Sequence, residues 1–135
     1  MSEKKKILIV EDETPLREAL SFKLKDEGFE VSEAVDGERG LEKAIAEHPD
    51  LILLDVLMPK MDGQEMVKEL QKDSWGKDAS VIFLTNVSDP NKVAQIGEDS
   101  RGVTTVFDYL VKSDWKLEDV VKKVRDELGM QSPIV

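Results

Sequence analysis

Short apolar runs that each end in a carboxylate constrain this chain more than any other feature. The run from Ile7 to Val10 is followed by Glu11 and Asp12, and the run from Leu51 to Leu54 is followed by Asp55. Runs of this length and composition are typical of strands that are buried on both faces, as in a parallel sheet. Because the carboxyl ends of parallel strands lie along one edge, the sequence predicts that acids from two strand ends meet there.

Strand-like segments alternate with segments of helical spacing along the whole chain. We expect five strands, at Lys6–Val10, Phe29–Ala34, Leu51–Asp55, Val81–Thr85 and within Val103–Val111. The apolar residues between these strands recur at intervals of three and four, as on one face of an α-helix. This alternation implies right-handed crossovers and an α/β fold, a three-layer, doubly wound (βα)5 parallel sheet with helices on both faces.

Residues at the expected helix ends agree with this reading. Thr14 followed by Pro15 predicts an N-cap and a first helical position, and Asp62 with Glu65 three residues later resembles a capping box. Gly28 and Gly129 are natural helix stops because glycine adopts the left-handed conformation readily.

Length and charge limit the classes of protein to consider. The 135 residues fit a single domain (residues 1–135), with a core over about residues 6–128 and a short flexible tail at 129–135. The net charge of -10 argues against direct binding of nucleic acid or an anionic membrane and favours a metal cation or a basic protein face. The absence of cysteine excludes disulfide scaffolding and thiolate chemistry but is neutral about compartment. The start of the chain lacks a small-residue cleavage site and no apolar run is long enough to span a bilayer, so we expect a cytoplasmic protein.

The acids at the two strand ends predict a divalent metal site. Carboxylates gathered within about 4 Å would repel one another by several kcal/mol per pair, so the cluster should recruit a cation, and Mg²⁺ is the expected one. We expect Asp12 to be a direct ligand and Glu11 to reach the ion through water. The alternative is that both acids only face solvent after a strand.

Asp55 is the candidate nucleophile for phosphoryl transfer. A carboxylate can attack a phosphoryl group when a metal and a cation offset the charge on the transferring oxygens. Lys112, just past the fifth strand, is the candidate cation, and Thr85, at the end of the fourth, can donate a hydrogen bond to a phosphoryl oxygen. Singly, Thr85 and Lys112 also have ordinary readings as a strand end and a solvated loop residue.

Together these segments resemble, in order and nearly in spacing, the receiver domain of two-component response regulators. The resemblance covers Lys6 to Leu128. It is carried by Glu11-Asp12, Asp55 with Met58-Pro59 and Gly63, Leu84-Thr85, and Tyr109-Leu110-Val111-Lys112.

This resemblance implies a flavodoxin-like fold of strand order 2-1-3-4-5 and a signalling module that is not an enzyme. It implies Mg²⁺-dependent transfer of a phosphoryl group to Asp55 from a sensor histidine kinase or a phosphotransfer protein, with the main-chain carbonyl of Leu57 as a further metal ligand. Thr85 and Tyr109 would then act as a switch that alters the face formed by the fourth helix, the fifth strand and the fifth helix. An unknown downstream protein would bind that face, and the chain would be a monomer or a phosphorylation-dependent dimer.

The chain departs from the receiver pattern at several places. Leu57 is apolar where receivers often have a polar residue, which predicts a longer-lived phosphorylated state. Lys112 is followed by Ser113 instead of proline, and because a cis bond there would cost about 3 kcal/mol, we expect a trans bond. Residues 97–107 form a longer connection than is usual, which leaves the downstream partner open.

Two other functions compete with the signalling module. A phosphatase of the haloacid-dehalogenase-like class also uses a strand-end aspartate and Mg²⁺, but it needs a second aspartate at the position of Leu57. A phosphorylation-independent receiver-like binding module is the other alternative, and the presence of Asp55, Thr85 and Lys112 counts against it. Because only Gly129 to Val135 follows the last helix, we expect a stand-alone receiver.

Overall fold

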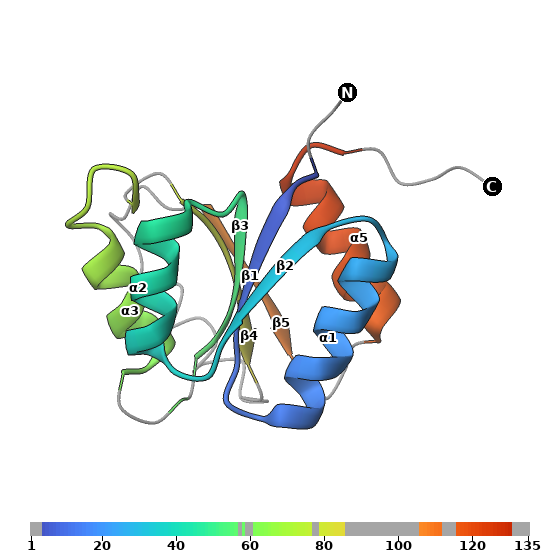
Figure 1. Ribbon diagram of the computed structural model, residues 1–135, viewed down its shortest axis with the longest axis horizontal. Coiled ribbons are helices and arrows are strands. Elements are labelled where there is room, and N and C mark those ends of the chain that lie inside the picture. Colours follow the sequence, from blue (N-terminus) through green and yellow to red (C-terminus); the bar gives the residue numbers. More distant parts are fainter. Residues whose placement is uncertain are drawn as a thin grey trace.

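The computed structural model describes residues 4–56, 58, 61–76, 79–85, 106–111 and 116–130. Within these ranges, a five-stranded sheet lies between two layers of helices (Figure 1). The elements in chain order are β1 (Lys6–Val10), α1 (Thr14–Asp26), β2 (Glu30–Ala34), α2 (Gly37–Glu47), β3 (Leu51–Asp55), α3 (Gly63–Leu70), β4 (Ser80–Thr85), β5 (Val106–Val111) and α5 (Leu117–Glu127). The predicted three-layer α/β fold is confirmed, while the expected fourth helix falls outside the described residues.

The strands run parallel in the order β2-β1-β3-β4-β5, as predicted. The chain first adds β2 on one side of β1 and then adds β3, β4 and β5 on the other side. Strand order therefore reverses between β1 and β3, and in such sheets ligands bind beyond the carboxyl ends of the strands at this reversal. Those ends carry Glu11, Asp12 and Asp55.

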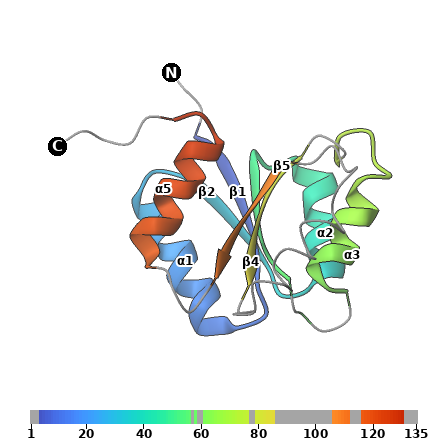
Figure 2. The same cartoon turned by 180° about the vertical axis from the view of Figure 1, so that it is seen from behind.

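Alternate side chains of the buried strands feed two separate cores. In β1, Ile7 and Ile9 point to one face and Leu8 and Val10 to the other, as the two-residue period of a strand requires. One core packs against α2 and α3 and the other against α1 and α5, and Figure 2 shows the same two layers from behind. Burial on both faces explains why β1 and β3 are continuous apolar runs in the sequence.

The helix ends fit the expected residues with one exception. The Asp62 side chain accepts a hydrogen bond from the Glu65 amide at 2.9 Å, which confirms this N-cap. Gly28 (φ 96°) and Gly129 (φ 69°) lie in the left-handed region just past α1 and α5, as predicted. The N-cap expected at Thr14 is wrong by one residue, because Thr14 is already helical and Glu13 holds the cap position. None of the described helices combines the length and apolar character that crossing a bilayer requires.

Strand β2 forms one edge of the sheet, and its exposed side carries charge. Glu30 is exposed and its carboxylate lies 3.8 Å from the Lys6 ammonium. Lys43, from α2, donates a hydrogen bond to the main-chain carbonyl of Glu33 at 2.7 Å. Charged side chains thus line this edge, and the Glu33 carbonyl that a further strand would need is already bonded to Lys43.

Candidate functional site

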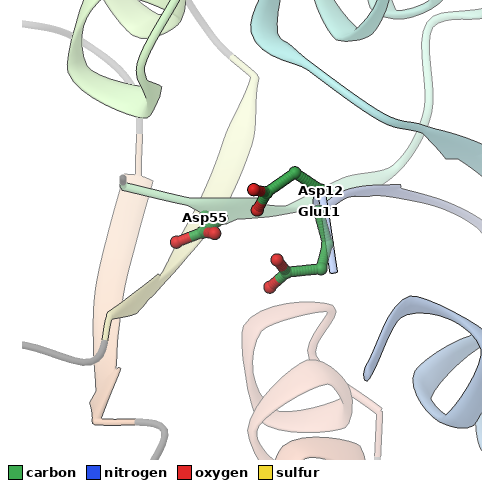
Figure 3. A group of neighbouring side chains, drawn as sticks. All are labelled: Glu11, Asp12 and Asp55. Atoms are coloured by element: carbon green, nitrogen blue, oxygen red, sulfur yellow. The ribbon is translucent and has the colours of Figure 1, made fainter. Parts of the chain in front are cut away.

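Three carboxyl groups meet at the carboxyl edge of the sheet, where strand order reverses. One carboxylate oxygen each from Glu11, Asp12 and Asp55 lies within 4.8 Å of the others. Figure 3 shows the carboxyl groups of Glu11 and Asp12 on the side that faces Asp55. The predicted convergence of acids from two strand ends is therefore present.

The end of β1 fixes the first of these acids. The Glu11 amide continues the strand pairing by donating to the carbonyl of Ala34 at 3.1 Å. Its side chain is fully buried, and its Oε2 accepts a hydrogen bond from the Glu13 amide at 3.1 Å. Asp12, one residue further, is exposed. The Glu11 carboxylate is thus enclosed by protein, whereas the Asp12 carboxylate is open to solvent.

Asp55 is the last residue of β3 and is 2% exposed. Beyond it, the Val56 amide donates to the Leu84 carbonyl at 3.1 Å, which continues the pairing with β4, and the Gly63 amide donates to the Val56 carbonyl at 2.9 Å, which places the start of α3 beside the end of β3. A Cβ at Gly63 would lie 2.5 Å from the carbonyl oxygen of Asp55, closer than real Cβ contacts. Glycine is therefore required where α3 begins, because any side chain would push this helix off the end of β3.

Burial makes the pair of Glu11 and Asp55 electrostatically costly. At the outer limit of 4.8 Å, two ionised carboxylates repel by about 3.5 kcal/mol at an effective dielectric of about 20. Both side chains are almost completely shielded from solvent, so salt screens this repulsion little. A cation between the two groups would turn the repulsion into attraction.

The donor set suits Mg²⁺. This ion prefers carboxylate and water oxygens in an octahedron with bonds of about 2.0–2.1 Å, so opposite ligands lie about 4 Å apart. Carboxylates that lie within 4.8 Å of one another fit such an ion if one of them binds through a water molecule. Two buried acids and one exposed acid also leave a side that is open to water.

Of the remaining predicted residues, Thr85 ends β4, the strand next to β3, and Tyr109 lies in β5, one strand further from Asp55. The main chain of Thr85 ends β4 and pairs with Val111, the last residue of β5. Tyr109 pairs with Phe83 in the same ladder. The carboxyl ends of β4 and β5 are therefore adjacent in space. Leu57, Lys112, Ser113 and residues 97–105 fall outside the described residues, so their predicted roles remain predictions.

Arg17, which reasoning from the sequence did not identify, contacts the loop that carries two of the acids. Its Nη1 donates to the carbonyl of Glu11 at 2.9 Å, and its Nε lies 3.2 Å from a carboxylate oxygen of Glu33. One signal was available. Arg17 is in the N-terminal part of α1, whose first turn contains no acid, whereas the helix dipole favours acids there and disfavours cations.

Similar folds occur among solved response regulators. The chemotaxis protein CheY4 of Vibrio cholerae superposes with a TM-score of 0.80 at 32% identity, covering 92% of this chain and 98% of that one. A putative response regulator from Chloroflexus aurantiacus gives a TM-score of 0.81 at 28% identity, covering 94% and 99%.

Curated relatives are longer proteins. A probable transcriptional regulator, ycf27, of Cyanophora paradoxa is 42% identical over 112 residues, which cover 81% of this chain and 42% of the relative. The phosphate regulon transcriptional regulatory protein PhoB of Escherichia coli is 30% identical over 130 residues, covering 96% of this chain and 54% of PhoB. The chain thus spans about half the length of these relatives.

The model of the response regulator receiver domain matches residues 7–125, nearly the whole chain. The match includes all five strands except Lys6, the first residue of β1, and the three clustered acids lie within it. The chain belongs to the family of response regulator receiver domains of two-component signalling.

Proposed function

We propose that this chain accepts a phosphoryl group on Asp55 from a histidine of a sensor kinase or phosphotransfer protein, in a reaction that requires Mg²⁺. The observation that carries this proposal is the convergence of Glu11, Asp12 and Asp55 within 4.8 Å, in a chain that matches the receiver family. In the transfer, the bond between phosphorus and the histidine nitrogen breaks and a bond to an Asp55 carboxylate oxygen forms. The released nitrogen keeps the electron pair and can take up a proton.

The residues of the chain have distinct tasks in this proposal. Glu11, Asp12 and Asp55 would hold the ion, with the carbonyl of Leu57 as a further ligand. When bound, Mg²⁺ supplies positive charge that offsets the charge on the transferring oxygens. Burial restricts the orientations open to the Asp55 carboxylate, and the hydrogen bond from the Gly63 amide to the Val56 carbonyl ties the end of β3 to the start of α3.

Signal output follows from the added charge. A phosphoryl group brings close to two negative charges and three acceptor oxygens to the end of β3. Thr85 and Lys112 would be drawn toward it, and Tyr109 would move into the vacated space and alter the face that contains β5 and α5. A downstream protein or domain would bind the altered face.

The relatives bear on the downstream partner. Several are named transcriptional regulators, and one, RpaA of Synechocystis, is named DNA-binding. This chain matches only about half of each, and its net charge of -10 disfavours direct contact with DNA. We propose that the receiver itself contacts protein and affects nucleic acid only through its partner.

Incubation with Mg²⁺ and acetyl phosphate, followed by intact-mass measurement, tests this function. We expect one phosphoryl adduct in the wild type and none in Asp55→Asn or in the presence of a chelator. Asp50→Asn is the matched control, because Asp50 stands at the other end of the same strand and asparagine can still accept the hydrogen bond from the Lys6 amide. An adduct that survives in Asp55→Asn would refute the assignment, and steady hydrolysis of phosphate esters would indicate a phosphatase.

A further inference from the structure

We infer that Arg17 is a positioning residue for the metal site: its guanidinium holds the main chain that carries Glu11 and Asp12, and Glu33 balances its charge. The inference deepens the proposed function and rests on it. Arg17 contacts main-chain carbonyls and not the carboxylates themselves, so it acts through the loop.

The guanidinium joins three elements at once. Nη1 donates to the carbonyl of Glu11 at 2.9 Å and makes a longer contact with the carbonyl of Asp12 at 3.5 Å. Nη2 lies 3.4 Å from the hydroxyl of Thr14, at the start of α1. Nε pairs with Glu33 of β2 at 3.2 Å. The turn between β1 and α1 is thus bound both to its own helix and to the neighbouring strand.

This arrangement needs an arginine. Its planar fork offers five N–H donors in fixed directions, so one side chain can serve carbonyls on one side and a carboxylate on the other. A lysine ammonium is a single point that cannot reach both sets of partners in the same geometry. The Arg17 side chain is only 12% exposed, so the contacts are shielded from competing water.

Glu33 resolves an electrostatic conflict. A positive charge beside the loop would weaken the binding of a divalent cation to the acids that the loop carries. The ion pair with Glu33 cancels that charge locally, so Arg17 can order the loop without repelling the ion. The pair therefore combines rigidity with near-zero net charge.

The test compares Arg17→Met, Arg17→Lys and Glu33→Gln with the wild type. Arg39→Met is the matched control, because it removes the same charge from the start of α2, where the arginine side chain is 68% exposed. The first readout is amide hydrogen exchange by NMR in the metal-free protein, at Glu11 and Glu13, with an amide of β3 as the reference for global opening. The second is Mg²⁺ affinity by calorimetry at low and high salt.

We expect faster exchange at Glu11 and Glu13 in Arg17→Met, with unchanged exchange in β3. Affinity for Mg²⁺ should fall by about tenfold at high salt and by less at low salt, where the unbalanced charge of Glu33 offsets part of the loss, and Arg17→Lys should not restore it. Glu33→Gln should weaken binding by about twofold to fivefold at low salt and less at high salt, because its effect is one of charge. In the Arg17→Met background, Glu33→Gln should weaken binding by a similar factor at low salt, because the field of the Glu33 carboxylate at the ion does not require Arg17.

Unchanged exchange at Glu11 and Glu13 in Arg17→Met would overturn the inference whatever the metal result. Mg²⁺ binding that is tighter in Arg17→Met, or equal to that of Arg39→Met, would overturn it as well. Because exchange is measured without metal or phosphodonor, it reports on Arg17 even if Asp55 is never phosphorylated. Failure of the wild type to form the Asp55 adduct, with the exchange result as expected, would instead refute the proposed function.

Discussion

Replacing Glu11 with glutamine should make the metal-free protein more stable and its metal complex weaker. The substitution removes one charge from the buried pair with Asp55 and leaves an oxygen that can still accept the hydrogen bond from the Glu13 amide. At 4.8 Å, the largest separation of the two carboxylate oxygens, the repulsion is about 3.5 kcal/mol at an effective dielectric of about 20. Because side chains relax and Asp12 is open to solvent, we expect a gain of about 1–3 kcal/mol in the free energy of unfolding.

Magnesium should reverse this advantage in part. At a concentration one hundred times its dissociation constant, the ion stabilises the wild type by about 2.7 kcal/mol. If the variant binds the ion about tenfold more weakly, the same concentration stabilises it by only about 1.4 kcal/mol. The difference in stability between the two proteins should therefore shrink as Mg²⁺ is added.

Urea unfolding with a chelator and with graded Mg²⁺ measures both quantities. Glu13→Gln is the matched control, since this exposed acid lies two residues away and makes no side-chain cap hydrogen bond. It should change stability by less than about 0.5 kcal/mol. The reasoning is refuted if Glu11→Gln is no more stable than the wild type without metal, or if Glu13→Gln gains as much.

Three further predictions concern the turn after β3. Gly63→Ala should lower the free energy of unfolding by about 2 kcal/mol, because its Cβ would meet the carbonyl of Asp55; an unchanged urea midpoint would contradict this. Asp62→Ala should lose about 1 kcal/mol with the cap on the Glu65 amide, whereas Asp62→Asn should keep it, as thermal unfolding can show. Leu57→Asn should shorten the lifetime of the phosphorylated protein, followed by intact mass after the donor is removed, and an equal lifetime would reject this role for Leu57.

The fold could be predicted because strands that are buried on both faces are recognisable in the sequence as apolar runs. Strands β1 and β3 have the predicted bounds, since residues enclosed on both faces form an unbroken apolar run. Strand β2 begins one residue later than expected. The reason is local: the Phe29 amide donates to the Leu24 carbonyl at 3.0 Å, so it closes the end of α1 and does not enter the sheet ladder. This bond is part of the helix end at Gly28, so the predicted helix stop also decides where the following strand begins.

The three acids of the site could be predicted from the sequence, whereas the role of Arg17 could not. Glu11, Asp12 and Asp55 follow strand ends, and the parallel topology brings strand ends together whatever the loops do. Arg17 acts through main-chain carbonyls, which every residue has, so its partners cannot be recognised by residue type. Only its position on the unfavourable end of a helix dipole sets it apart.

The acidic outer strand has a consequence for how copies of this protein meet. A second molecule that offered its own β2 as a pairing partner would have to displace Lys43 from the Glu33 carbonyl and would bring the exposed Glu30 side chain of each molecule to the new pairing edge. Growth of the sheet from one molecule into the next is thereby discouraged, even in a crowded cell where nascent chains collide often. The edge strand β2, on the opposite side of the sheet from β5, is thus protected from pairing with a strand of another molecule.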